Sequence, residues 1–185
     1  KDGPMSLTLT TPPGEEVMTL AAVKQLLRID HDADDALIAA CLAAAREQVE
    51  AATGLALVTQ GWRLVRAEIP LAGIVLPRPP VQAVSGVAID DGEGGWAALP
   101  AERWQLSAAG PARVIVPGLA PAGPVRIDFT AGFGDAGAVP ETLKQAIRLL
   151  TVHYYEQREP LAPSALRAVP SGVAALVAPW REVRL

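Results

Sequence analysis

The segment from residue 125 to residue 160 does most to constrain the fold, because a strand pattern runs almost directly into a helix with sharp ends. Val125 to Phe129 alternates apolar and polar residues, which is typical of a strand with one face on a core. Pro140 and Glu141 predict the start of a helix, since proline lacks an amide hydrogen and glutamate favours the positive end of the helix dipole. Pro160 predicts the end of that helix. The chain therefore combines strands and helices.

Two further helices are predicted before this segment. Thr19 is the expected cap of a short helix that ends near residue 30, and Asp32 is the expected cap of a longer helix that ends near Thr53. Gly54 follows where a left-handed residue is favoured. The longer helix carries an apolar stripe, whose members are Ile38, Leu42, Ala45, Val49 and Ala52. Three charged residues of this helix are expected to face away from that stripe: Arg46, Glu47 and Glu50.

Between these helices and the last one, the pattern changes to short strands separated by Pro and Gly clusters. The strand candidates are 62–64, 74–76, 84–89, 104–106, 113–116 and 125–129. Residues 90–95 are expected to form a mobile hairpin tip. Neither this glycine-rich stretch nor Thr-Ala-Gly-Phe-Gly at 130–134 has the Lys-Ser/Thr of a phosphate-binding loop, so both predict turns.

The expected fold class is α+β, with a mainly α-helical core of long antiparallel helices. A strand-rich insertion at about 60–133 lies between the second and third helices, inside an expected domain at 18–160. Residues 1–17 are expected to be a flexible arm, with residues 1–4 a cloning remnant before Met5. Residues 161–185 are expected to form a linker and an extended C-terminal tail that binds a partner.

Composition excludes several classes of protein. The 185 residues carry 16 Lys and Arg against 20 Asp and Glu, which argues against a broad basic surface that grips nucleic acid. No apolar run approaches the roughly 20 residues that span a bilayer, and no secretory leader is recognised. A single cysteine, Cys41, favours a reducing compartment, and it is expected to be a buried thiol rather than a nucleophile.

No catalytic, metal or cofactor site is predicted. Aspartates at 30, 32 and 34 imitate the start of a calcium loop, but Asp35 and Cys41 stand where that loop needs Gly and Glu. His31 and His153 have no nucleophile motif beside them. The chain is therefore expected not to be an enzyme.

The C-terminal segment ends with an aromatic and a basic residue next to each other, Trp180 and Arg181. Such residues are favoured anchors of protein interfaces. Two alternatives remain open at this point: the segment binds a partner, or it folds back on the core of its own chain.

An ordered series of motifs resembles the head–tail connector (adaptor) proteins of long-tailed phages and gene transfer agents. The resemblance spans residues 18–181. Its carriers are LAAVKQLLRID at 20–30, DDALIAA at 34–40, ARE at 45–47, TG at 53–54, LPRPPV at 76–81, TAGFG at 130–134, VP at 139–140, KQAI at 144–147 and HYYEQRE at 153–159. The closing motif is Gly172, Val173, Leu176, Pro179, Trp180 and Arg181, with Trp where the family more often has Tyr.

This resemblance implies a structural protein, made in the bacterial cytoplasm, at the head–tail junction of a phage or phage-like particle. It implies a dodecameric ring beneath the portal protein that binds a stopper or tail protein below and lets DNA pass through its lumen without specific binding. In this family the C-terminal segment reaches the portal, which implies portal contacts for Leu176, Pro179, Trp180 and Arg181. Charged residues of the long helices are the candidate ring interface: Arg46, Glu50, Arg148 and Arg158.

The alternative function is an accessory factor for DNA packaging or DNA binding that acts with the terminase. Its basis is a set of arginines in the strand region that could form a local basic patch despite the formal net charge of −4. These are Arg63, Arg66, Arg78, Arg103 and Arg113.

Overall fold

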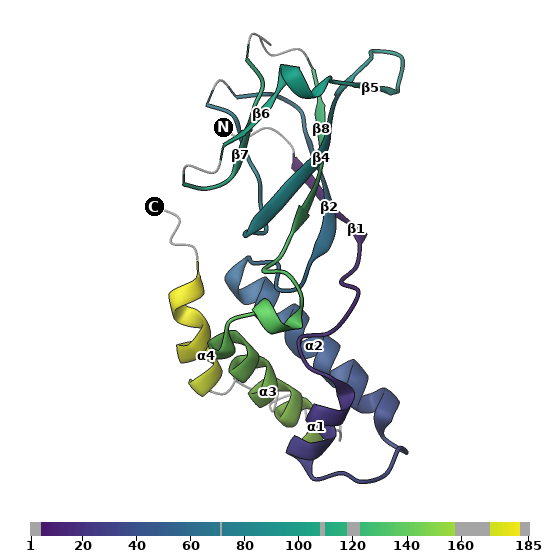
Figure 1. Cartoon of the computed structure of the whole chain (residues 1–185), viewed down its shortest axis with the longest axis vertical. Helices are drawn as coiled ribbons and strands as arrows, with labels where there is room; N and C mark the ends of the chain where they lie inside the picture. Colours follow the sequence, from purple (N-terminus) through teal and green to yellow (C-terminus); the bar gives the residue numbers. More distant parts are fainter. Residues whose placement is uncertain (1–4, 71, 108–109, 118–122, 158–170, 182–185) are drawn as a thin grey trace, which may run out of the picture. The chain divides into compact units, whose positions relative to one another are not determined.

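The computed structural model describes residues 5–70, 72–107, 110–117, 123–157 and 171–181. The chain divides into two compact units, each built from two separate stretches of sequence. The strand unit contains residues 1–14 and 59–133, and the helical unit contains residues 15–58 and 134–185. Figure 1 labels the helices and strands that make up these units.

The helical unit contains α1 (Leu20–Leu27), α2 (Asp35–Thr53), α3 (Glu141–Glu156) and α4 (Ser171–Val177). Two short 3-10 helices also belong to it, η2 (Ala136–Ala138) and η4 (Ala178–Trp180). The predicted caps are confirmed at two ends: the Ala22 amide donates to the Thr19 hydroxyl at 3.2 Å, and Gly54 adopts φ 77° after α2. The cap of α2 is Asp34 rather than Asp32, whose side chain instead pairs with Lys24.

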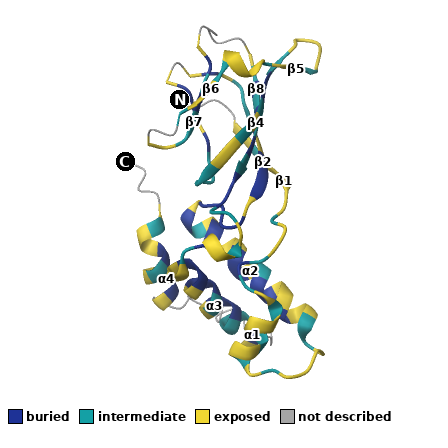
Figure 2. Cartoon of the chain, in the orientation of Figure 1, coloured by how far each residue is buried: buried dark blue, intermediate teal, exposed yellow. Residues whose placement is uncertain are grey.

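The core of the helical unit lies between α2 and α3. Both helices place apolar residues at helical spacing on the buried side, coloured dark blue in Figure 2. Fully or almost fully buried members are Ile38, Leu42, Ala45, Val49, Leu143, Ala146, Ile147 and Leu150. Ala45 and Ala146 are the small members of this set, and the others are larger aliphatic side chains. Cys41 is buried on α2, as predicted.

The strand unit holds two antiparallel sheets. The larger sheet has the order β1-β2-β8-β4-β5, and the smaller has the order β3-β7-β6. The strands are β1 (Met5–Thr11), β2 (Gln60–Arg66), β3 (Ile74–Val75), β4 (Val81–Asp90), β5 (Trp96–Ala98), β6 (Gln105–Ser107), β7 (Arg113–Ile115) and β8 (Val125–Ala131), and η1 (Ala101–Arg103) is a 3-10 turn.

The alternation predicted for β8 sets the two faces of the larger sheet. Its odd-numbered residues are buried and its even-numbered residues, including Asp128, are partly exposed. Register extends this division to the neighbours: Leu64 of β2 and Val87 of β4 both lie opposite Ile127 and are buried. The residues on the opposite face are largely small or polar. The inner face therefore supplies large apolar side chains such as Leu64, Ile127 and Phe129 to the core of the strand unit.

The prediction of a mainly α-helical core with long antiparallel helices is wrong. The strands form two sheets and a compact unit of their own, and α1 and α4 have only 8 and 7 residues. The reason is that a helix shows its apolar stripe in one continuous segment, whereas the core of the strand unit is divided among short strands distant in sequence. Each predicted strand segment overlaps a strand of the structure, but their pairing into sheets was not anticipated.

A further difference concerns the N-terminal segment, for which the sequence predicted a flexible arm over 1–17. The structure instead places β1 against β2, with Leu7 opposite Leu64 and Thr8 opposite Arg63. Pairing of backbone groups with a distant strand stabilises this segment, and its own composition does not reveal that partner. The expected cloning remnant at 1–4, the helix end at Pro160 and the linker at 161–170 lie outside the described residues.

Candidate functional site

The C-terminal segment is held on its own helical unit by two valines and one tryptophan. Val173 and Val177, one turn apart on α4, are buried, and α4 lies beside α3 (Figure 1). The indole Nε1 of Trp180 donates to the hydroxyl of Thr142 on α3 at 3.2 Å. Of the alternatives left open by the sequence, the structure therefore shows the segment folded back on its own unit as far as Arg181.

The predicted portal-binding residues keep surface available in this position. Pro179 and Arg181 are exposed, whereas Leu176 and Trp180 are partly exposed. A small hollow of about 80 Å³ lies beneath α4 and is lined by residues of three helices and by Arg181. Its apolar lining includes Val49, Ala52, Leu150, Val173 and Val177. The segment thus contacts its own unit through one face and exposes the other.

Two of the predicted ring-interface residues are buried within the helical unit. Arg46 and Glu50 are each 7% exposed and form an ion pair at 3.0 Å, which corrects the expectation that they face away from the core. The guanidinium Nε of Arg46 also donates to Glu16 at 2.9 Å, and the second carboxylate oxygen of Glu50 accepts from the Leu57 amide at 2.9 Å. Burial opposes the charge of Arg46, but the hydrogen bond to Glu16 and the nearby carboxylates raise the pKa of its guanidinium.

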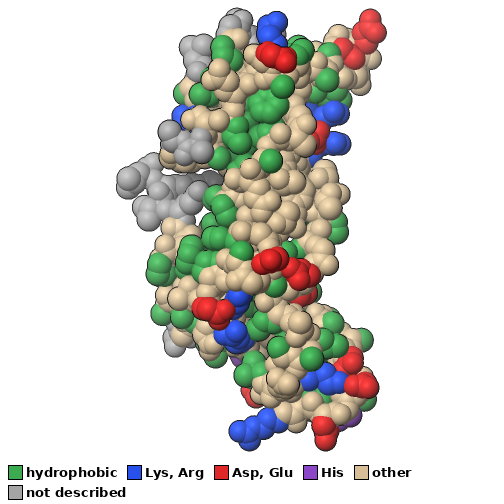
Figure 3. All heavy atoms as spheres, in the orientation of Figure 1, with side chains coloured by type: hydrophobic (Ala, Val, Ile, Leu, Met, Phe, Trp, Pro, Cys, Tyr) green, Lys and Arg blue, Asp and Glu red, His purple; other side chains and the backbone are tan. Residues whose placement is uncertain are grey.

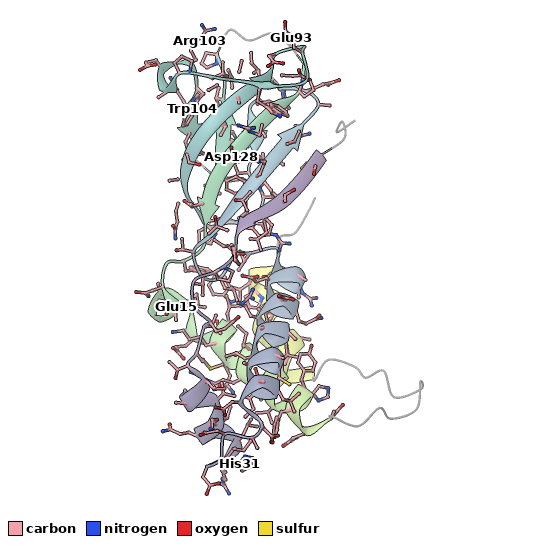
Figure 4. The ribbon with its side chains drawn as sticks, turned by 90° about the vertical axis from the view of Figure 1, so that its right-hand side faces the viewer. Glu15, His31, Glu93, Arg103, Trp104 and Asp128 are labelled. Carbon is pink, nitrogen blue, oxygen red and sulfur yellow. The ribbon has the colours of Figure 1, made fainter. Side chains whose placement is uncertain are left out.

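This buried network was not predictable from local pattern. Arg46 and Glu50 are one turn apart, but Glu16 lies within residues 1–17, which were expected to form a flexible arm. The neighbouring Glu15 makes a separate, exposed contact, in which its carboxylate accepts from the Ala136 amide at 2.9 Å. Figure 4 shows Glu15 beside the segment that leads into α3. The available signals were the one-turn spacing of Arg46 and Glu50 and two consecutive glutamates before a helix.

The third interface candidate, Arg148, lies on the surface of α3. Its guanidinium bonds to Glu141 at 3.3 Å and to Gln145 at 3.3 Å. Glu141 also pairs with Lys144 at 3.1 Å, and this hydrogen bond to Lys144 is the main reason that the pKa of Glu141 is lowered. The fourth candidate, Arg158, lies outside the described residues.

Three of the five arginines that suggested a basic patch have partners in the strand unit. Arg63 forms an ion pair with Asp128 at 2.6 Å, Arg78 stacks over the Trp62 ring at 5.1 Å, and Arg113 donates to the Ala72 carbonyl at 3.1 Å. Arg66 is partly exposed, and Arg103 is exposed on η1 (Figure 4). On the face drawn in Figure 3, basic and acidic side chains of the described residues occur in small mixed groups.

The glycine-rich tip after β4 satisfies its own amides. The Oδ1 atom of Asp91 accepts from the amides of Glu93 and Gly95 at 2.9 and 2.8 Å. These backbone hydrogen bonds lower the pKa of Asp91. The tip is a hairpin between β4 and β5, as predicted, and its amides are occupied by a carboxylate rather than arranged for a phosphate.

The acidic segment before α2 also has a structural explanation. Lys24 pairs with Asp32 at 2.5 Å and with Asp35 at 2.8 Å, and the Tyr155 hydroxyl donates to Asp34 at 2.5 Å. Within the described ranges, no group of three or more His, Cys, Asp or Glu side chains could hold a metal ion. None of the described helices is both long and apolar enough to cross a membrane.

The two histidines lie on different elements, His31 in a loop and His153 on α3. His31 is exposed in the loop between α1 and α2 (Figure 4). The Nδ1 atom of His153 lies 2.9 Å from Nε2, the side-chain amide nitrogen of Gln157. The imidazole ring of His153 is tilted against the ring of Tyr154. The pKa of the Tyr154 hydroxyl is raised, mainly because the hydroxyl is partly buried. These contacts account for His153 near the end of α3.

Residues 16–165 match the family model described as head completion protein (HCP). No match was found among functionally curated proteins. Three solved structures resemble the chain over almost its whole length. A chain from the virion of the native gene transfer agent (GTA) particle has 33% identity and a TM-score of 0.82, with 97% of this chain and 96% of that chain covered.

Two chains from particle necks resemble it similarly. A chain from the neck of the empty GTA particle, computed with C6 symmetry, has 32% identity and a TM-score of 0.80. A chain from the neck of the native GTA particle, computed with C12 symmetry, has 33% identity and a TM-score of 0.76. In both cases 97% of this chain and 97% of the other chain are covered.

Proposed function

Because the chain belongs to the head completion protein family, we propose that it is a structural head–tail connector in the neck of a phage-like particle. The family resemblance inferred from the sequence is confirmed by the match over residues 16–165. The observation that carries the proposal is 33% identity over 97% of the chain to a protein of a GTA neck. The head–tail junction is accordingly its location.

In the neck, copies of the chain form a ring. The C6 and C12 symmetries of the related necks support a cyclic arrangement. A cyclic ring needs a heterologous interface, in which one face of a subunit meets a different face of its neighbour. We further propose that the ring lies beneath the portal, binds a stopper or tail protein, and lets DNA pass through its lumen. An acidic chain suits this passage, since tight phosphate contacts would retain the DNA.

The role that we propose is not enzymatic. Titratable side chains in close contact, such as Arg46 with Glu50 and Arg63 with Asp128, form structural ion pairs. Support for a structural role comes chiefly from the family and from the particle structures that its relatives occupy.

We propose that the C-terminal segment provides the portal contact, through Leu176, Pro179, Trp180 and Arg181. The support is geometric: the segment exposes Pro179 and Arg181, and a single exposed hydrogen bond holds the Trp180 indole to α3. A hydrogen bond of this kind contributes only about 1 kcal/mol, so a partner can replace it at small cost. The buried Val173 and Val177 keep α4 in place meanwhile.

The test is to compare Trp180→Ala with Trp96→Ala in particle assembly and portal pull-down. Trp96 lies in the strand unit, with Arg126 over its ring, and is partly exposed like Trp180. Trp96→Ala is therefore the matched control, because it also removes a partly exposed tryptophan. Trp180→Ala should reduce portal attachment at least tenfold while circular dichroism shows a folded chain, whereas Trp96→Ala should attach normally. Normal attachment of Trp180→Ala would remove the segment from the portal contact.

A second variant separates the two roles of Trp180. Thr142→Val removes the hydroxyl that accepts the indole hydrogen bond but leaves the tryptophan in place. Portal attachment should persist in this variant. If Thr142→Val and Trp180→Ala lose attachment equally, the contact with α3 matters rather than a contact with the portal. Imaging of the vertex tests the wider proposal, which fails if no ring of this fold lies between portal and tail.

A further inference from the structure

The larger sheet of the strand unit has two edges that other strands of the described chain leave uncovered. At one edge, β1 pairs with β2 alone. At the other, β5 pairs with Ala88–Asp90, and the Leu99 amide reaches the Val87 carbonyl, so Val81–Gly86 of β4 remains uncovered. Figure 4 shows β1 as the outermost strand on one side of the sheet and β4 towards the other.

Neither edge carries the residues that usually protect a sheet from pairing. β1 reads MSLTLTT and the uncovered part of β4 reads VQAVSG, so both lack charged residues and proline. Native proteins place such residues on exposed edges, because unpaired backbone N–H and C=O groups otherwise recruit another strand. Two edges of similar length on one sheet, both without charged residues and proline, indicate that each is covered in the assembled state.

We propose that β1 of one copy pairs antiparallel with Val81–Gly86 in the next copy, so that the sheet continues from subunit to subunit around the ring. This inference rests on the proposed function, which supplies the neighbouring copy. The occupant of each edge is thus a second copy of this chain, bound by strand addition.

Strand directions agree with this arrangement. In the order β1-β2-β8-β4 each neighbouring pair is antiparallel, so β1 and β4 run in opposite directions. A cyclic rotation that places the next copy's sheet alongside brings its β1 antiparallel to β4 of the first copy. The interface uses two different edges, which is the heterologous contact that ring closure requires.

The outer face next to both edges leaves room for this approach. Ser6 and Thr8 of β1 and Ala83 of β4 are exposed, and a Cβ atom placed on Gly86 would meet nothing within 4 Å. Register shifts occur in β1 between Leu9 and Thr11, and in β4 before Ala83 and before Gly86. Such bulges increase the local twist and hinder pairing with a flat, unrelated edge, so a strand that pairs here has to share this twist.

Disulfide trapping in purified particles tests the proposal. Cysteines are introduced at Ser6 or Thr8 together with Ala83 or Ser85, in a Cys41→Ala chain. Cross-strand Cβ atoms lie about 4.5–5.5 Å apart, within reach of a disulfide, and the panel covers neighbouring registers. At least one pair should give a ladder of linked subunits after oxidation, while each single variant should give none. The matched control replaces the β1 cysteine by one at exposed Gln105 of β6, which should also give no ladder.

A charge substitution provides an independent measurement. Ser6→Glu with Thr8→Glu places two carboxylates on the edge of β1 that would pair with β4 of the next copy; this proposed junction is called the seam. Within the chain, Thr8 lies opposite Arg63, so a glutamate at position 8 faces a positive charge and the fold is retained. Incorporation of the chain into particles should fall at least tenfold. The control, Ala101→Glu with Gln105→Glu, adds the same charge at exposed positions outside the seam and should be incorporated normally.

The outcomes distinguish this inference from the proposed function. If the chain is in the neck but no cysteine pair forms a ladder and the glutamate variant is incorporated normally, the continuous sheet is excluded and the connector role stands. If the unmodified chain is absent from purified particles, the connector role itself is wrong, and the proposed pairing of β1 with β4 between copies is then wrong as well.

Discussion

Arg46 illustrates how single residues of the helical unit connect segments that are distant in sequence. Its guanidinium bridges Glu16, which precedes α1, and Glu50, one turn further along α2. Glu50 in turn accepts the amide of Leu57, in the segment that leaves α2. One buried network therefore fixes both the entry to and the exit from the first helical stretch.

Removal of Glu50 should be costly for this reason. Glu50→Ala leaves the buried Arg46 with Glu16 and the more distant, exposed Glu47, and leaves the Leu57 amide without its acceptor. Breaking a buried ion pair from one side costs about 3–5 kcal/mol, and we expect urea unfolding to show a loss near the lower value. Glu47→Ala is the matched control, because its side chain is 70% exposed and lies 3.7 Å from Arg46. That change should cost under about 1 kcal/mol; equal losses would contradict the role of the network.

At the scale of elements, the helices were predictable because each carries its own start and stop signals. Thr19 caps α1, Gly54 ends α2, and Pro140 with Glu141 opens α3. β1 and β5 carried no such signal, since backbone pairing with other strands defines them. The candidate site likewise depends on contacts between distant segments, which local signals do not reveal.

Among the site residues, the exposed or buried state could not be predicted from helical spacing alone. Arg46 and Glu50 lie off the apolar stripe of α2, yet residues 16 and 57 cover them. Trp180 was singled out from the sequence as a candidate anchor, but its contact with Thr142 depends on the packing of α4 against α3. Long-range packing, which a single segment does not encode, decides these cases.

The close approach of β1 to β2 gives a prediction at the same scale. A Cβ atom on Gly61 would lie 2.9 Å from the Thr11 hydroxyl oxygen and 3.1 Å from that of Thr10. Gly61→Ala should therefore displace the end of β1, with faster amide hydrogen exchange there and a stability loss of about 1 kcal/mol. Gly86→Ala, in the same sheet, adds a methyl group to open space and should leave exchange of β1 unchanged. Unchanged exchange in both variants would show that β1 absorbs the methyl group without moving.

At the scale of the whole molecule, charge distinguishes a connector from a DNA-packaging factor. The formal net charge is −4, and within the strand unit Arg63 and Arg113 already bond to a carboxylate and a carbonyl. Affinity for duplex DNA comes mainly from phosphate contacts and falls steeply with salt. A protein through whose ring DNA slides should make few of these contacts.

We therefore expect weak binding of the purified chain to duplex DNA. Fluorescence anisotropy should show no saturation at micromolar protein at about 150 mM salt, and a shallow dependence of any low-salt binding on salt concentration. The matched variant is Asp128→Asn, which removes the carboxylate that pairs with Arg63 and Arg126 and so leaves two guanidinium groups less neutralised. This variant should bind DNA more tightly at low salt than the unmodified chain, because the arginines can then contact phosphates. Micromolar affinity of the unmodified chain with a steep salt slope would instead favour the DNA-packaging alternative, and the paired arginines of the strand unit would then be the first residues to test by substitution.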